Sequence, residues 1–175
     1  PNKEALAASK GEKTPPDLKE SFNGGPLQTP TKKIKDGRAY EFCYQPTIWP
    51  EIDGFKEAWT NYYLEMEKLA ARIMSAFAEA LNLEPYFFDK YLKCPISALR
   101  ALYYPETTHV PEYGQQRAGA HTDYGSLTIL LPQPETSGLQ LKLNGKWIDV
   151  PTIKDTFVIN IGDLMELWTP LGLLC

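Results

Sequence analysis

The stretch "GAHTDYGSLTIL", residues 119–130, places a histidine and an aspartate directly ahead of a run of strand-forming residues. His121 and Asp123 are two positions apart, and residues i and i+2 of a strand project from the same face. An imidazole nitrogen and a carboxylate oxygen would therefore point into the same space, as two ligands of one metal ion do. The commoner explanation for such a pair is a histidine that hydrogen-bonds a nearby aspartate in a surface loop.

A third protein ligand would separate the two explanations. A second histidine would complete the set of two histidines and one carboxylate that leaves positions open on Fe(II) for a co-substrate and O₂. Zinc hydrolases more often carry HExxH or a set of cysteines, and the sequence contains neither. The one other histidine, His109, lies in "PETTHVPEYGQQ", and we interpret it as a loop residue.

The segments around this stretch have the two-residue period of strands. The predicted strands are "SALRALYYP" (97–105), "SLTILLPQ" (126–133) and "TFVINIGD" (156–163). In "GLQLKLNGKWIDVP" (138–151), Asn144-Gly145 separates two alternating segments, which predicts a β-hairpin. We expect these strands to follow one another as a meander.

Before the strands, the sequence predicts helices and an arm. Apolar residues recur at spacings of three and four from Trp59 to Leu81, and Asn82 and Pro85 mark the end of this helix. "EPYFFDKYLKCP" (84–95) predicts a short second helix. We therefore expect one domain made of three segments: an extended N-terminal arm over 1–50, a helical segment over 51–95 and a strand-rich core over 96–175. The fold class is mainly β with flanking helices.

The composition excludes several classes of protein. A net charge of −4 argues against a nucleic-acid partner held by counterion release. No run of eighteen apolar residues is present, so we expect no membrane span. The three cysteines form no CxxC pair, which favours a reducing, cytoplasmic location. The sequence does not indicate an oligomeric state.

Four segments, "LRALYYP", "HTDYGSLTIL", "GLQLKLNGKWIDVP" and "FVINIGDLMELWT", occur in this order. With them the chain resembles the isopenicillin N synthase-like family of Fe(II)- and 2-oxoglutarate-dependent oxygenases, from about "DLKESF" (17–22) through Thr169. The resemblance implies a double-stranded β-helix, a jelly roll related to the cupins, with helices packed outside. Residues 96–175 would then form part of the jelly-roll oxygenase core.

The resemblance also assigns roles to individual residues. His121 and Asp123 match two iron ligands, and Tyr104 matches the tyrosine whose hydroxyl helps to hold the distal carboxylate of 2-oxoglutarate. Tyr104 shares its predicted strand face with Arg100 and Leu102, and this face is the more polar one, as a pocket wall would be. The alternative for Tyr104 is a core tyrosine with a satisfied hydroxyl.

The implied reaction uses Fe(II), 2-oxoglutarate and O₂ to oxidise a small organic substrate, with hydroxylation the expected outcome, and releases succinate and CO₂. After "GDLMELWT" the family continues with a strand that bears a second histidine and an arginine, whereas this sequence reads "PLGLLC". We therefore expect a jelly roll incomplete at the C-terminus and a chain that is inactive by itself. The alternatives are a non-catalytic jelly-roll binding or interaction module and a cupin-type metal-dependent hydrolase or isomerase.

Overall fold

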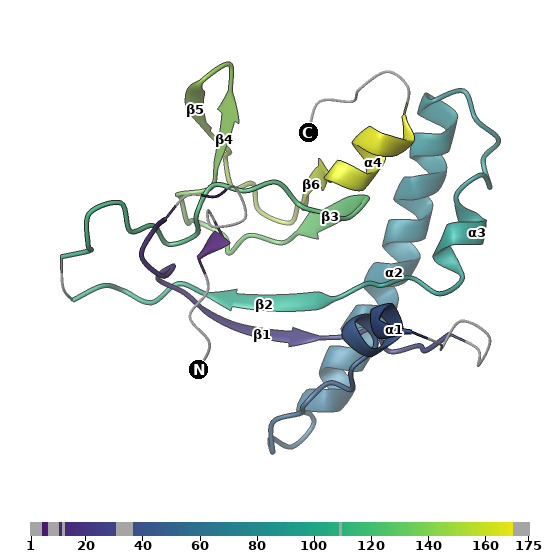
Figure 1. Cartoon of the computed structure of the whole chain (residues 1–175), viewed down its shortest axis with the longest axis horizontal. Helices are drawn as coiled ribbons and strands as arrows, with labels where there is room; N and C mark the ends of the chain where they lie inside the picture. The colour runs from purple at the N-terminus through teal and green to yellow at the C-terminus, as the bar shows by residue number, and fades with distance from the viewer. Residues whose placement is uncertain (1–4, 7–10, 12, 31–36, 109, 170–175) are drawn as a thin grey trace. The chain divides into compact units, whose positions relative to one another are not determined.

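The computed structural model describes residues 5–6, 11, 13–30, 37–108 and 110–169 (Figure 1). The chain divides into two compact units after Ala120. The first unit contains, in order, β1 (Glu20–Gly24), α1 (Arg38–Cys43), α2 (Phe55–Ala80), α3 (Asp89–Leu92) and β2 (Leu99–Tyr103). The second contains β3 (Leu127–Leu130), β4 (Gln140–Leu143), β5 (Lys146–Asp149), β6 (Val158–Ile161) and α4 (Asp163–Trp168).

The long helix α2 ends where the sequence predicts. Asn82 has a φ of 55°, in the left-handed region, and its amide donates to the Glu79 carbonyl at 3.0 Å. The Leu83 amide donates to the Ala78 carbonyl at 2.8 Å. These two bonds form a Schellman motif, which satisfies carbonyls that the last helical turn leaves without partners. The predicted helix and its stop signal are thus confirmed.

The apolar stripe of α2 lies in the core of the first unit. Tyr63, Met74 and Ala78 are buried, and Phe22 of β1 meets the Trp59 ring edge-on at a centroid distance of 4.8 Å. Edge-on aromatic contacts place the positive rim of one ring against the negative face of the other, which stabilises the packing beyond its buried area. The apolar stripe of α2 therefore serves the packing of this unit.

A strand and a short helix lie within the segment for which an extended arm is predicted. β1 pairs antiparallel with β2, from Glu20 opposite Tyr103 to Gly24 opposite Leu99, and the two strands lie side by side in Figure 1. "ESFNG" carries little strand signal of its own, so cross-strand pairing and the packing of Phe22 decide its conformation. The division into segments 1–50, 51–95 and 96–175 stays a prediction.

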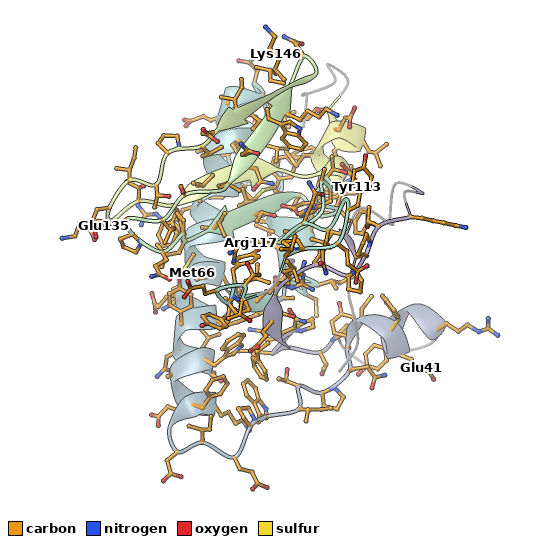
Figure 2. All side chains as sticks on the ribbon, turned by 90° about the vertical axis from the view of Figure 1, so that its left-hand side faces the viewer. Glu41, Met66, Tyr113, Arg117, Glu135 and Lys146 are labelled. Atoms are coloured by element: carbon orange, nitrogen blue, oxygen red, sulfur yellow. The ribbon has the colours of Figure 1, made fainter. Side chains whose placement is uncertain are left out.

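In the second unit the predicted hairpin is confirmed. β4 and β5 pair with Leu143 opposite Lys146, and the two residues between them, Asn144 and Gly145, have φ values of 50° and 77°. Two consecutive positive φ values are those of a type I′ turn, whose twist suits the flanking strands. Figure 2 shows Lys146 at the end of this hairpin.

The expected meander is wrong, because β3 pairs with β6 and not with β4. Leu127 lies opposite Ile161 and Leu130 opposite Val158, so the hairpin is an excursion between two paired strands. The connection after β3 contains Pro132 and Pro134, which cannot donate to a strand ladder. Neither proline can extend the ladder of β3, whose partner is the later strand β6.

A glycine at the end of β1 gives a test of this packing. Gly25 has a φ of 110°, and a Cβ on it would lie 2.7 Å from Tyr63 Cε2 and 2.9 Å from the Ser97 carbonyl oxygen. Gly54 also has a positive φ, of 73°, but no atom lies within 4 Å of its Cβ position. We expect Gly25→Ala to lower the free energy of unfolding by about 1–3 kcal/mol more than Gly54→Ala, because overpacking adds to the backbone strain. Urea denaturation measures both, and equal losses would contradict the close packing.

The pH dependence of stability gives a second test. Burial raises the pKa of Tyr63 to about 12, and its hydroxyl donates to the Ser97 carbonyl at 3.1 Å. In the unfolded chain a tyrosine ionises near pH 10, so from about pH 10 to 12 only the unfolded state releases this proton. Stability should therefore fall with rising pH across this window, and more steeply in the wild type than in Tyr63→Phe. Parallel pH profiles of the two proteins would show that the Tyr63 hydroxyl is not protected.

Candidate metal centre

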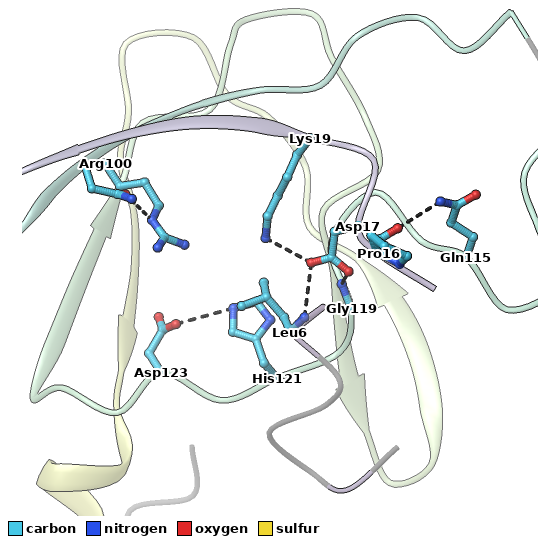
Figure 3. A network of polar contacts seen from close by, with 10 residues as sticks. Leu6, Pro16, Asp17, Lys19, Arg100, Gln115, Gly119, His121 and Asp123 are labelled. Atoms are coloured by element: carbon cyan, nitrogen blue, oxygen red, sulfur yellow. Dashed lines mark hydrogen bonds and ion pairs between the residues drawn. The ribbon is translucent and has the colours of Figure 1, made fainter. Parts of the chain in front are cut away.

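His121 and Asp123 face each other in the loop that precedes β3. The Nε2 atom of His121 lies 3.6 Å from Oδ1 of Asp123. Figure 3 shows the two side chains pointing toward each other. This distance is longer than a direct N–H···O hydrogen bond. The side chains are 37% and 31% exposed. The sequence pattern thus places the two predicted ligands together, although the loop itself is not a strand.

The other carboxylate oxygen of Asp123 is held by the β3–β6 sheet. Oδ2 accepts a hydrogen bond from Thr128 Oγ1 at 2.6 Å and another from Asn160 Nδ2 at 2.8 Å. Two donors on one oxygen restrict rotation of the carboxylate, since both bonds would be lost if it turned. Oδ1 therefore stays on the side of His121.

The backbone of the same loop is fixed by the start of α4. The first amides of a helix have no partner within the helix, and here the loop supplies three carbonyl acceptors. The bonds run from Gly162 N to Ser126 O (3.2 Å), from Asp163 N to Asp123 O (2.8 Å) and from Leu164 N to Gly125 O (3.2 Å). Thr122 Oγ1 also donates to Asp163 Oδ2 at 3.1 Å. The aspartate is thus held through both its side chain and its backbone.

These bonds require a glycine at position 162. A Cβ on Gly162 would lie 2.2 Å from the Gly125 carbonyl oxygen and 2.7 Å from that of Asp123. Both contacts are with backbone atoms, which cannot move aside as the end of a flexible side chain can. The Gly-Asp pair of "VINIGDL" is therefore a close-approach point between the end of β6 and the loop of His121 and Asp123.

The donor atoms suit two positions of a metal ion. With metal–ligand bonds of about 2.1 Å, two ligands at right angles lie about 3 Å apart, a little less than the His121–Asp123 separation. An imidazole nitrogen and a carboxylate oxygen are two members of the set that binds Fe(II) in oxygenases. Within the described part of the chain, no group of three His, Cys, Asp or Glu residues is placed to hold a metal. The residues present fit the metal in part, as two ligands of three.

Tyr104 belongs to the first unit, where it directly follows β2. It is 41% exposed, so it is not a buried core residue. Upstream on β2, Arg100 Nε donates to Oδ1 of Asn23 on β1 at 2.6 Å, and the two residues are opposite each other in the ladder. The polar face predicted for this strand is thus present, while the role of Tyr104 stays a prediction. His109 lies outside the described residues.

A buried ion pair fixes the chain just before the His121 loop. Asp17 and Lys19 form a 3.0 Å ion pair whose side chains are 2% and 3% exposed (Figure 3). Oδ1 of Asp17 accepts the Gly119 amide at 3.2 Å, and Oδ2 also accepts the Leu6 amide at 3.3 Å. A buried carboxylate needs such partners, because loss of its hydration is otherwise costly. Asp17 thereby joins the N-terminal segment to the residues that lead into the loop.

Comparison with known proteins places these features in a family. The family described as the 2OG-Fe(II) oxygenase superfamily matches residues 95–173. The 2-oxoglutarate-dependent dioxygenase caaD of Aspergillus niger is 35% identical over 171 residues, which cover 91% of this chain and 50% of that protein. The chain belongs to the 2OG-Fe(II) oxygenase superfamily. Clavatol oxidase claD of Penicillium crustosum is another relative, 32% identical over 87% of this chain and 47% of its own length.

The predicted oxygenase fold is confirmed by a solved structure. A full-length Neurospora crassa protein, crystallised in complex with alpha-KG, matches with a TM-score of 0.74 and 34% identity, over 89% of this chain and 46% of that one. The jelly roll, and Fe(II) with 2-oxoglutarate as the family's metal and co-substrate, are thus as the sequence predicts. The chain spans about half the length of the curated superfamily relatives that it matches.

Sequence reasoning missed the residues that hold Asp123. Thr128 and Asn160 are polar residues inside otherwise apolar four-residue strands, "LTIL" and "VINI". A polar residue at such a position indicates a specific hydrogen-bond partner, so the signal was present in the sequence. The role of Asp163 was less visible, since helix α4 was not predicted.

Gly162→Ala tests the close approach at the loop of His121 and Asp123. The added Cβ cannot fit without displacing the backbone of the loop, so we expect a loss of stability of about 1–3 kcal/mol and weaker metal binding. Gly125→Ala is the matched control, because no atom lies within 4 Å of its Cβ position. Thermal unfolding and calorimetric titration with Mn(II) measure the two effects. A Gly162→Ala protein as stable as Gly125→Ala would refute the steric argument.

Proposed function

We propose that this chain carries the first two metal ligands of an Fe(II)- and 2-oxoglutarate-dependent oxygenase acting on a small organic substrate. In this reaction one oxygen atom of O₂ enters the substrate and the other enters succinate, with release of CO₂. The observation that carries the proposal is the pair His121 Nε2 and Asp123 Oδ1, 3.6 Å apart, with the second oxygen of Asp123 held by two donors. Family membership supports the same reaction class.

Each residue has a distinct task in this proposal. His121 offers its Nε2 atom, and Asp123 offers a negative charge that offsets part of the charge of a divalent cation. Bound Fe(II) would supply the redox chemistry between O₂ and 2-oxoglutarate. Tyr104 would donate its hydroxyl to the distal carboxylate of 2-oxoglutarate, a bond that contributes binding but no redox chemistry.

The small-molecule substrate and O₂ follow from the superfamily. Among the described residues, no helix combines the length and the apolar character that crossing a bilayer requires. A cytoplasmic location and the lack of a nucleic-acid partner remain parts of the proposal, based on the net charge and on cysteine usage.

Metal titration tests the proposal directly. We expect the chain to bind Mn(II), used in place of Fe(II) to avoid oxidation, more weakly than a protein with three ligands, and Asp123→Ala to abolish this binding. Tyr104→Phe should leave Mn(II) binding unchanged while weakening 2-oxoglutarate by about 0.5–3 kcal/mol. Tyr103→Phe is the matched control, because it removes the same kind of hydroxyl from the neighbouring position, the last residue of β2.

The outcomes separate the alternatives. Equal loss of metal in Asp123→Ala and Tyr104→Phe would show that Tyr104 has been assigned wrongly. A chain that binds 2-oxoglutarate equally well with and without Mn(II) would contradict the oxygenase proposal. A chain that binds neither Mn(II) nor 2-oxoglutarate would instead be the non-catalytic binding module.

A further inference from the structure

Two polar residues on neighbouring strands donate to the same atom of Asp123. Thr128 of β3 and Asn160 of β6 are direct partners in the antiparallel ladder, so their side chains share one face of the sheet. The next pair on that face, Leu130 and Val158, is apolar. The two polar residues therefore form an isolated pair at the end of the sheet that is nearer the loop of His121 and Asp123.

The two hydrogen bonds that this pair makes to Asp123 have a defined direction. An ionised carboxylate can only accept hydrogen bonds, so both the Thr128 hydroxyl and the Asn160 amide must donate to Asp123 Oδ2. Such bonds to a charged acceptor are stronger than those between neutral groups, and the 2.6 Å Thr128 bond is correspondingly short. The two oxygens of Asp123 are thus unequal: Oδ2 faces two donors, and Oδ1 faces His121.

This inequality matters for a metal, because a carboxylate can bind through one oxygen or through both. Binding through both would use an additional coordination position, and an oxygenase needs positions left open for its co-substrate and O₂. An oxygen that already accepts two charge-assisted bonds is a poorer metal ligand. The sheet therefore favours binding through Oδ1 alone.

We propose that Thr128 and Asn160 are positioning residues that orient Asp123 as a single-oxygen metal ligand. They do not touch the metal or a substrate, and they act through the Asp123 carboxylate alone. The inference rests on the metal-binding part of the proposed function and not on its oxidation chemistry. A merely structural role would require only that the pair stabilises the sheet.

The experiment compares substitutions that remove a hydrogen-bond donor at nearly constant side-chain volume with one that retains the hydroxyl group. Thr128→Val removes the donor at nearly constant volume, Thr128→Ser retains it, and Asn160→Leu replaces the amide by an apolar group of similar size. Thr152→Val is the matched control, since Thr152 Oγ1 donates to the Thr136 carbonyl in the same unit and not to Asp123. Each protein is titrated with Mn(II) by calorimetry, and the visible spectrum of its Co(II) complex is recorded.

We expect Thr128→Val and Asn160→Leu each to raise the Mn(II) dissociation constant about 10-fold, the usual effect of losing a partner of a metal ligand. Their Co(II) spectra should change as Asp123 becomes free to bind through both oxygens. Thr128→Ser and Thr152→Val should retain the wild-type affinity and spectrum. Thermal unfolding without metal reports any general loss of stability separately.

Unchanged affinity and spectrum in both Thr128→Val and Asn160→Leu would overturn the inference. A loss of Mn(II) affinity in Thr128→Ser equal to that in Thr128→Val would also overturn it, because the hydroxyl would then be irrelevant. A wild-type chain that binds no metal would overturn both the inference and the metal ligands of the proposed function. Metal binding with the expected variant effects, but no metal dependence of 2-oxoglutarate binding, would overturn the oxygenase proposal alone.

Discussion

The hydrogen bond from the Asp163 amide to the Asp123 carbonyl, 2.8 Å long, is the constraint on which the second unit depends. It joins the start of α4 to the loop before β3, two segments about forty residues apart in the sequence. Its neighbours, at the Gly162 and Leu164 amides, close the same gap and leave no room for a side chain. The start of α4, the end of the β3–β6 sheet and the loop of His121 and Asp123 therefore form one rigid junction.

Around this junction each acidic side chain has a hydrogen-bond donor beside it. Asp123 and Asp163 are both acidic and close in space, and each carboxylate has a hydroxyl donor, Thr128 for one and Thr122 for the other. Hydroxyl donors lower the cost of holding two negative charges near each other, and a cation beside Asp123 would lower it further. These side chains come from one loop, two strands and a helix, and the hydrogen bonds between them fix the Asp123 and Asp163 carboxylates in place.

The sequence could predict what depends on local pattern. The 3.6-residue period of α2, its stop at Asn82 and the Asn144-Gly145 turn each act over a few residues, and each is confirmed. Pairing between strands far apart in the sequence could not be predicted in this way. β1 pairs with β2 across about seventy-five residues, and β3 pairs with β6 and not with β4. The spacing of His121 and Asp123 indicated a pair, and the family resemblance gave that pair its role. Thr128 and Asn160 act together only because the ladder sets them opposite each other.

The buried pair of Asp17 and Lys19 bears on where an independent folding unit can begin. The superfamily match starts at residue 95, but β2 takes its ladder partner from residues 20–24, and the Gly119 amide takes its acceptor from residue 17. A fragment cut at the limits of the match would leave that amide without its acceptor and β2 with an open edge, which invites pairing with other chains. The segment by which a family is recognised and the stretch that supplies the hydrogen-bond partners of its strands are different objects, and here the second begins some eighty residues further upstream.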